Sequence, residues 1–363
     1  MPVDWRVPLR GLLRSRTQNW PDYQRLFLIE DRSSWVIHWE MMQLADAASR
    51  SGIKTAHPFW MPHSKNQAVF YGSQFFLLAQ DWITRPHRIA TAYFHGKPGT
   101  GPEEFDLLYQ QVVKHHEKIS RLQVSHSEME QVLLETGIAP EKVHRIPIGI
   151  QCDLFPRQTP ASKQASRISL GIAEDAFVVG SFQKDGEGWG DGDEPKLIKG
   201  PDVFVQSLER IRDVVPNLHV LLSGPARGYV KKELGKLGIP FTHHSVKHYP
   251  DIHRLYAALD CYLVASRQEG GPKAVLESMS SGIPLVTTRV GQAMDMVLDG
   301  VNGFMCEVED VDGLAERVLQ VFRKSEECNP MLSEARKVAE ANDYQQLDPL
   351  WQTFFDGFVE ASV

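Results

Sequence analysis

Residues 261–288 read CYLVASRQEGGPKAVLESMSSGIPLVTT and change character three times. The apolar runs at 261–265 and 284–288 predict two buried strands. Between them, Pro272 suits the first position of a helix, where its missing N–H costs nothing, and Gly282 suits the helix end. The order of strand, glycine-rich turn, helix and strand is typical of a parallel α/β sheet.

Two carboxylates, Glu269 and Glu277, flank this turn. Gly270 and Gly271 leave the backbone bare at the helix amino end, where free N–H groups and the helix dipole favour an anion. At roughly 1.5 Å of rise per residue, the carboxylates can lie on the order of 10 Å apart. That distance predicts a nucleotide sugar, with hexose hydroxyls on Glu269 and ribose hydroxyls on Glu277. The alternative is an ordinary turn and a solvated helix glutamate, which suits an isolated pair better than one placed after a strand.

The same residues resemble the retaining glycosyltransferases of family 4 (glycosyl transferases group 1). Glu269 and Glu277 match the family's spacing of two glutamates, and 284–288, Gly291 and 302–304 continue its pattern. The resemblance covers about residues 122–320. It implies the GT-B fold, an α/β architecture of two Rossmann-like domains with parallel sheets facing across a cleft. It also implies a C-terminal helix that crosses back to the first domain.

A chain of 363 residues is long enough for two domains, and alternating strand and helix patterns run through both halves. The polar, aperiodic segment 156–168 is the predicted linker. It separates an N-terminal acceptor-binding domain, 1–155, from a C-terminal nucleotide-sugar-binding domain, 169–342. Residues 347–359 carry an apolar stripe at helical spacing, so a helix within 343–363 needs a buried partner.

Amino-acid composition limits the classes of binding partner and the cellular compartment that we expect for this protein. A net charge of -7 argues against a general nucleic-acid binder. The four cysteines lack metal-site spacing, which favours reduced thiols in a cytoplasm. No apolar run reaches the length of a membrane span. The basic amphipathic residues 1–20 either contact the inner face of a membrane peripherally or pack on their own domain.

The resemblance extends to the donor site. Lys199 matches the family lysine that holds the diphosphate, and Lys184 is the nearest candidate for a family arginine that this chain lacks. His95 ends an N-terminal strand, where it either contacts the transferred sugar or caps the strand. The expected catalytic residues are Glu269, His95 and Lys199, and the expected donor-binding residues are Lys184, Lys199, Gly224, Val246, Gly270, Gly271, Pro272, Lys273, Ala274 and Glu277.

Two segments depart from the family pattern. The acidic insertion 185–194 lacks the glutamate at position twelve of a calcium loop, so a mobile flap is expected there and no metal site. In the N-terminal domain, 31–35 replaces the usual glycine-rich turn. Either Arg32 or Ser33 takes over the role of that turn, or the acceptor enters the site by a different route.

These observations predict a metal-independent hexosyltransferase without a cofactor. It would move a sugar, with retention, from a UDP- or GDP-linked donor to a hydroxyl of a glycan or lipid-linked acceptor. The expected setting is cell-surface polysaccharide biosynthesis in the cytoplasm. The alternatives are a non-catalytic nucleotide-sugar-binding subunit and a GT-B epimerase or phosphorylase.

Overall fold

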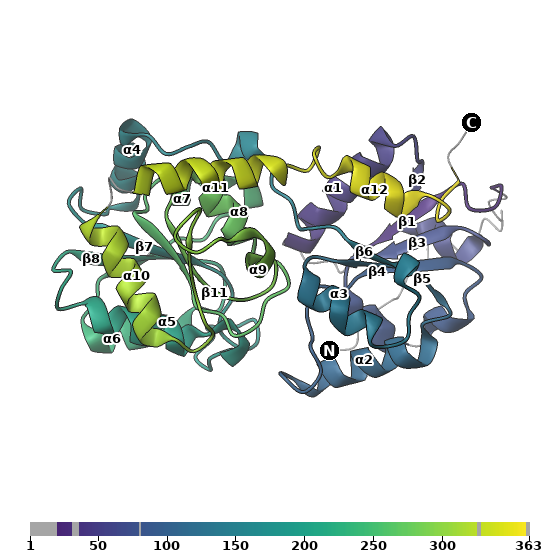
Figure 1. The fold of residues 1–363 in the computed structure, drawn as a ribbon, viewed down its shortest axis with the longest axis horizontal. Coiled ribbons are helices and arrows are strands. Elements are labelled where there is room, and N and C mark those ends of the chain that lie inside the picture. Colours follow the sequence, from purple (N-terminus) through teal and green to yellow (C-terminus); the bar gives the residue numbers. More distant parts are fainter. Residues whose placement is uncertain (1–19, 31–35, 80, 325–327, 361–363) are drawn as a thin grey trace. The chain divides into compact units, whose positions relative to one another are not determined.

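The computed structural model describes residues 20–30, 36–79, 81–324 and 328–360, which fold into two compact α/β units (Figure 1). Unit 1 draws on Met1–Val124, Glu130–Ile146 and Asp348–Val363, and unit 2 on Ser125–Met129 and Pro147–Leu347. The expectations for the basic stretch up to residue 19 and for Arg32 and Ser33 lie outside the described residues. None of the helices in the described ranges has the length and apolar character of a membrane span.

Unit 1 is built on a parallel sheet of six strands in the order β2-β1-β3-β4-β5-β6. The strands are β1 (Leu26–Ile29), β2 (Thr55–Ala56), β3 (Ala68–Tyr71), β4 (Arg88–Ala92), β5 (Ile119–Val124) and β6 (Val143–Arg145). Its helices are α1 (Val36–Arg50), α2 (Glu103–His115), α3 (Ser127–Leu134), which starts in unit 2, and α12 (Asp348–Phe355). Parallel strands need crossover connections, which α1, α2, α3 and short 3-10 turns provide.

The last helix, α12, belongs to unit 1, which confirms the expected return to the N-terminal domain. Its apolar stripe packs on the sheet: the rings of Trp351 and Phe354 lie 6.2 and 5.8 Å from that of Phe70 on β3. Arg50 at the end of α1 donates to the Asp348 carboxylate at 2.6 Å. The apolar spacing at 347–359 therefore identified a buried helix correctly.

A buried histidine makes unit 1 sensitive to acid. His87 accepts the Gln67 N–H through Nδ1 at 3.2 Å. Burial, with repulsion from Arg85, lowers the pKa of His87 to about 4. Because the unfolded chain binds the proton first, stability is complete near pH 7 and falls as the pH drops from about 6.5 to about 4. The loss should approach about 3 kcal/mol for this group.

Urea unfolding followed from pH 7 to 4 measures this loss. The His87→Gln variant keeps a neutral acceptor and should show a flatter pH dependence than the parent protein. The matched control is His63→Gln, because His63 is exposed in the same unit and its removal should leave the pH profile unchanged. Equal profiles for His87→Gln and the parent would contradict the role of His87.

Unit 2 contains a second parallel sheet of six strands, in the order β12-β11-β10-β7-β8-β9. The strands are β7 (Phe177–Phe182), β8 (Leu218–Ser223), β9 (Phe241–His243), β10 (Cys261–Val264), β11 (Leu285–Thr288) and β12 (Phe304–Cys306). The helices are α4 (Pro160–Leu170), α5 (Pro201–Ile211), α6 (Gly228–Leu237), α7 (His253–Tyr256), α8 (Lys273–Ser281), α9 (Ala293–Met296), α10 (Val311–Arg323) and α11 (Asn329–Ala341). This is the doubly wound order of nucleotide-binding sheets.

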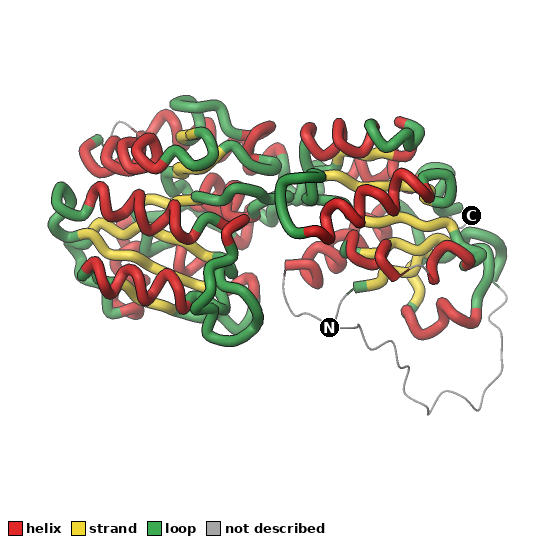
Figure 2. The backbone as a smooth tube through the Cα atoms, turned by 90° about the horizontal axis from the view of Figure 1, so that it is seen from below, coloured by secondary structure: helices red, strands yellow, loops and turns green. Residues whose placement is uncertain are grey.

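Helices cover both faces of this sheet, as Figure 2 shows for the yellow strands between red helices. Alternate residues of a strand serve opposite faces, since strand side chains repeat every two residues. Val179 packs into a core cluster with α5, α6 and α10, whereas Val178 packs into a second cluster with α7, α8 and α11. Both faces are therefore apolar, which explains why β7 and β10 read as continuous hydrophobic runs.

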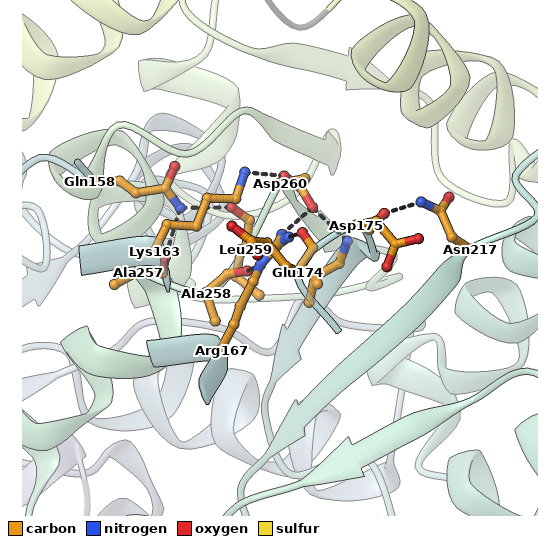
Figure 3. A network of polar contacts seen from close by, with 11 residues as sticks. Gln158, Lys163, Arg167, Glu174, Asp175, Asn217, Ala257, Ala258, Leu259 and Asp260 are labelled. Carbon is orange, nitrogen blue, oxygen red and sulfur yellow. Dashed lines mark hydrogen bonds and ion pairs between the residues drawn. The ribbon is translucent and has the colours of Figure 1, made fainter. Parts of the chain in front are cut away.

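The segment predicted as a linker, 156–168, is largely the helix α4 within unit 2, so the linker prediction is wrong there. Thr159 and Ser162 form a capping box, and Gly171 ends the helix with a φ of 67°. Arg167 donates to the Asp260 carboxylate at 2.6 Å and to the Ala258 carbonyl at 3.1 Å (Figure 3). Polar contacts anchor this helix, and hydrophobic periodicity does not reveal such contacts.

Candidate functional site

Strand order brings two loops of unit 2 together. The order reverses between β7 and β10, and in such sheets ligands bind at the carboxyl ends of the strands where the order reverses. The Ile198 carbonyl, in the loop after β7, accepts the N–H groups of Arg267 and Gln268, in the loop after β10, at 2.9 and 3.0 Å. Gly200 has a φ of 60°, and a Cβ there would lie 1.9 Å from the Ala265 carbonyl oxygen. Only glycine permits this approach.

The joined loops hold the Lys199 ammonium 2.6 Å from the Glu269 carboxylate. Ser266 Oγ donates to the other Glu269 oxygen at 2.9 Å, and Thr288 Oγ1 fixes the Ser266 carbonyl at 2.6 Å. Glu269 is only 9% exposed. Two residues predicted independently to touch the donor are thus neighbours, with a carboxylate able to accept sugar hydroxyls and a cation able to hold phosphate.

A third lysine, Lys196, joins this site and was missed by sequence reasoning. It is half-buried, and burial lowers the pKa of its ammonium, with repulsion from Lys199 and Lys184 adding to the effect. The nearby carboxylates of Glu187 and Glu269 oppose that shift. Lys184 and Lys199 thus lie near enough to act on Lys196, and this concentration of positive charge favours an anion. Its position three residues before Lys199 was the signal available in the sequence.

The amino end of α8 lies on the same edge of the sheet. The Gly270 carbonyl accepts the Gln292 N–H at 3.1 Å and Ser125 Oγ at 2.7 Å. A Cβ on Gly271 would lie 2.8 Å from Gln292 Oε1. The helix begins at Lys273, so Pro272 precedes it instead of opening it, and Ala274 is buried in its first turn. The first amides of a helix lack intrahelical acceptors, which keeps this end suited to an anion.

The structure directs the Lys273 side chain toward protein groups. Its ammonium donates to the Tyr344 hydroxyl at 2.7 Å and to the Gly149 carbonyl at 3.3 Å, and it is buried. It also lies 5.0 Å from the Tyr249 ring centroid. These contacts give Lys273 an anchoring role for the start of α8.

Glu277 is buried beneath a group of tyrosines. It accepts hydrogen bonds from the hydroxyl of Tyr256 at 2.7 Å and from that of Tyr249. Burial, followed by the Glu277 charge, raises the pKa of Tyr256 far above its usual value, so this tyrosine stays a donor. Two tyrosine hydroxyls therefore fix the position of the Glu277 carboxylate.

Two more of the expected donor-binding residues, Gly224 and Val246, lie in the segments that follow β8 and β9. Gly224 has a φ of 96°, and its carbonyl accepts His243 Nε2–H at 2.8 Å. Val246 is half-buried and packs against the apolar cluster that contains Tyr256. Within the described ranges, no group of three or more His, Cys, Asp or Glu residues is arranged to hold a metal ion.

His95 belongs to unit 1, whereas Glu269 and Lys199 belong to unit 2. It follows β4 by three residues, and Gln74 holds its backbone: Gln74 Nε2 donates to the His95 carbonyl at 2.5 Å. The imidazole lies near the rings of Phe105 and Phe75, at centroid distances of 5.3 and 6.1 Å. Its place at the carboxyl edge of the unit 1 sheet suits a contact with ligand, which stays a prediction.

The acidic insertion 185–194 is a packed loop, in contrast to the expected flap. It closes on itself through a bridge between Gly186 and Pro195. The carbonyls of Asp191 and Gly192 accept the first N–H groups of α6, from Gly228 at 2.6 Å and Tyr229 at 2.8 Å. The loop thereby caps α6, and the glycines in it allow the backbones to touch.

A buried ion pair fixes the base of this loop. Arg227 Nε lies 2.9 Å from Asp185 Oδ1, and both side chains are 0% exposed. The guanidinium also donates to three carbonyls, those of Ser181, Gln183 and Ser223, at 2.6 to 3.1 Å. Burial raises the pKa of the Asp185 carboxyl. Attraction to the Arg227 guanidinium is the largest effect that opposes this rise, so it favours the charged carboxylate.

Residues 195–338 match the model of the family described as glycosyl transferases group 1. EpsD of Bacillus subtilis strain 168, named as a glycosyltransferase, is 25% identical over 230 residues, which are 62% of this chain and 57% of EpsD. A D-inositol 3-phosphate glycosyltransferase of Streptosporangium roseum is 30% identical over 203 residues, 51% of this chain and 42% of that protein. The chain thus spans about half the length of the curated relatives it matches.

Solved structures agree on the fold. HepE of Anabaena, in complex with UDP-glucose, superposes with a TM-score of 0.73 at 18% identity, covering 92% of this chain and 99% of HepE. Sucrose-phosphate synthase of Thermosynechococcus elongatus gives 0.71 at 14% identity, covering 92% and 98%. The two parallel sheets and these likenesses show that the chain has the GT-B fold, and its residues 195–338 match the family model of glycosyl transferases group 1.

Proposed function

We propose that this protein transfers a sugar from a nucleoside-diphosphate donor, UDP- or GDP-linked, to a hydroxyl of a glycan or lipid-linked acceptor. The observation that carries the proposal is the pair of Lys199 and Glu269, 2.6 Å apart at the reversal point of the unit 2 sheet. A carboxylate for sugar hydroxyls stands there beside a cation for phosphate. Lys184 and Lys196 add charge for the diphosphate, and Glu277 is the proposed ribose ligand.

In the proposed reaction, the bond between the anomeric carbon and the diphosphate oxygen breaks. The acceptor oxygen forms the new bond on the same face of the sugar, and its proton passes to the departing phosphate oxygen. Negative charge grows on the diphosphate as the sugar leaves, so lysines and helix amides placed there stabilise the transition state more than the ground state. Neither a metal nor a cofactor is needed in this proposal.

The family match supports transfer in preference to simple binding, and HepE, which shares the fold, was crystallised with UDP-glucose. The proposed setting is polysaccharide assembly at the cytoplasmic face of a membrane. A ligand contact for His95, at the carboxyl edge of the unit 1 sheet, belongs to the same proposal.

Nucleotides should raise the melting temperature of the protein. A ligand that binds only the folded state stabilises it by about 2.7 kcal/mol at a concentration of 100 times Kd. We expect a rise with UDP or GDP and a smaller one for Lys199→Met, because that change removes a phosphate ligand. Thermal unfolding with UDP, GDP and ADP measures both effects.

The matched control is Lys236→Met, since Lys236 is an exposed lysine of the same unit, on α6. It should respond to nucleotide as the parent does. Absence of any shift with all three nucleotides would contradict the proposed donor site. An unchanged response in Lys199→Met would remove that lysine from it.

A further inference from the structure

Trp189 stands 70% exposed in the 185–196 loop of unit 2. A tryptophan carries a large apolar surface whose burial would stabilise the fold. Here the chain leaves that surface in solvent, so core packing does not explain the residue. The exposed ring is therefore a candidate contact for a ligand.

The loop that carries Trp189 is held firmly at its base and along its side. The buried pair of Asp185 and Arg227 fixes the base, and two backbone hydrogen bonds dock Asp191 and Gly192 on the amino end of α6. A binding group that is already in place costs little conformational entropy when its ligand arrives. The packed loop therefore presents the indole as a preformed surface.

Lys184 supports the ring and connects it to the donor site. Its ammonium lies 4.7 Å from the Trp189 ring centroid, within the range of a cation–π contact. Lys184 and Lys199 both act on the ammonium of Lys196, and so does the Glu269 carboxylate. The indole is thus linked to the candidate donor site through Lys184 and Lys196.

The chemistry around the indole fits a sugar ring. One face of a pyranose carries mainly C–H groups, which pack well on the electron-rich face of an aromatic ring. Hydroxyls at the edge of the pyranose need acceptors. The loop supplies exposed carboxylates on Glu187, Asp191, Asp193 and Glu194. The same carboxylates disfavour an anionic ligand.

We propose that Trp189 is a stacking platform for a pyranose ring of the acceptor glycan, next to the donor site. This inference rests on the proposed function, because only a glycosyltransferase needs an acceptor sugar beside its donor. The exposed ring suits a glycan whose other side stays in solvent. The transferred sugar, in contrast, is expected at Glu269, which is 9% exposed.

The test measures glycan binding apart from nucleotide binding. The full chain is applied to an array of immobilised oligosaccharides built from gluco-, galacto- and mannopyranose units. Trp189→Ala should lose about tenfold or more in apparent affinity for the glycans that the parent binds, whereas Trp189→Phe keeps a ring and should retain most of it. The matched control is Ile168→Ala, since Ile168 is 74% exposed on α4 of the same unit.

Thermal unfolding with UDP, GDP and ADP is run on the same variants. Trp189→Ala should keep the nucleotide response of the parent, because the indole is assigned to the acceptor side. If nucleotides stabilise the parent and Trp189→Ala binds glycans as the parent does, the stacking role is wrong and the proposed function stands. The stacking role is equally wrong if the parent binds no glycan on the array. A nucleotide response lost in Trp189→Ala would place the ring at the donor and overturn the acceptor assignment. If nucleotides fail to stabilise even the parent, the proposed function itself fails.

Discussion

Glu269→Gln should lower kcat/KM for sugar transfer by about a hundredfold to a thousandfold, the range seen when one preorganised polar group at a reacting centre is removed. Glutamine has the same shape and length as glutamate but lacks the negative charge. The sugar hydroxyls then donate to a neutral oxygen, and Lys199 faces the diphosphate without its 2.6 Å partner. Steady-state transfer with the donor that stabilises the protein best measures the effect.

The nucleotide response separates this role from general damage. UDP or GDP binding should survive in Glu269→Gln, because ribose and diphosphate are assigned to other residues. Glu309→Gln is the matched control: Glu309 pairs with Arg267, two residues before Glu269, and is largely exposed. Its removal should leave transfer within a few-fold of the parent, as exposed ion pairs contribute only about 0 to 1 kcal/mol. Transfer at the parental rate in Glu269→Gln would exclude a role for the carboxylate in the reaction.

The sequence predicted local features of this site well. A strand, a turn and a helix are set by short-range pattern, so β10 and α8 lie within a residue of their expected bounds. The meeting of Lys199 and Glu269 follows from the same pattern, because parallel strands put the loops after them on one edge of the sheet. A doubly wound sheet has few alternatives once its strands are known.

Contacts between distant residues account for what sequence reasoning missed. The local sequence of 156–168 does not indicate that Arg167 pairs with the distant Asp260, so a polar helix resembled a linker. Likewise, the tyrosines on Glu277 come from positions 249 and 256, and only the folded chain brings them together. The acidic insertion resembled a flap because its partner, Arg227, comes 42 residues after Asp185 in the sequence, beyond the end of β8. Polar partners that are buried leave no periodic signal in a sequence.

Arg227→Met should destabilise unit 2 by about 3–5 kcal/mol, the cost of leaving one member of a buried ion pair without its partner. Methionine replaces the aliphatic part of the arginine side chain but not its charge. The Asp185 carboxylate is then buried without a cation, and three carbonyls lose their hydrogen-bond donor. Asp185→Asn should cost less, about 1–3 kcal/mol. In that variant the guanidinium keeps its hydrogen bonds to the carbonyls. Removing the aspartate charge should therefore destabilise the unit less than removing the arginine.

Denaturant unfolding, compared through midpoints and slopes, measures the order of the variants. The matched control is Arg210→Met, which breaks a pair with Asp312 on the surface of the same unit, where the side chains are 57% and 82% exposed. That change should cost at most about 1 kcal/mol. A cost in Arg227→Met no greater than in Arg210→Met would show that the buried pair does not hold the loop.

If the pair does hold the loop, Arg227→Met should also weaken nucleotide binding under conditions where the variant remains folded. The 185–196 loop carries Lys196 and follows Lys184, so loosening its base displaces two of the three lysines assigned to the diphosphate.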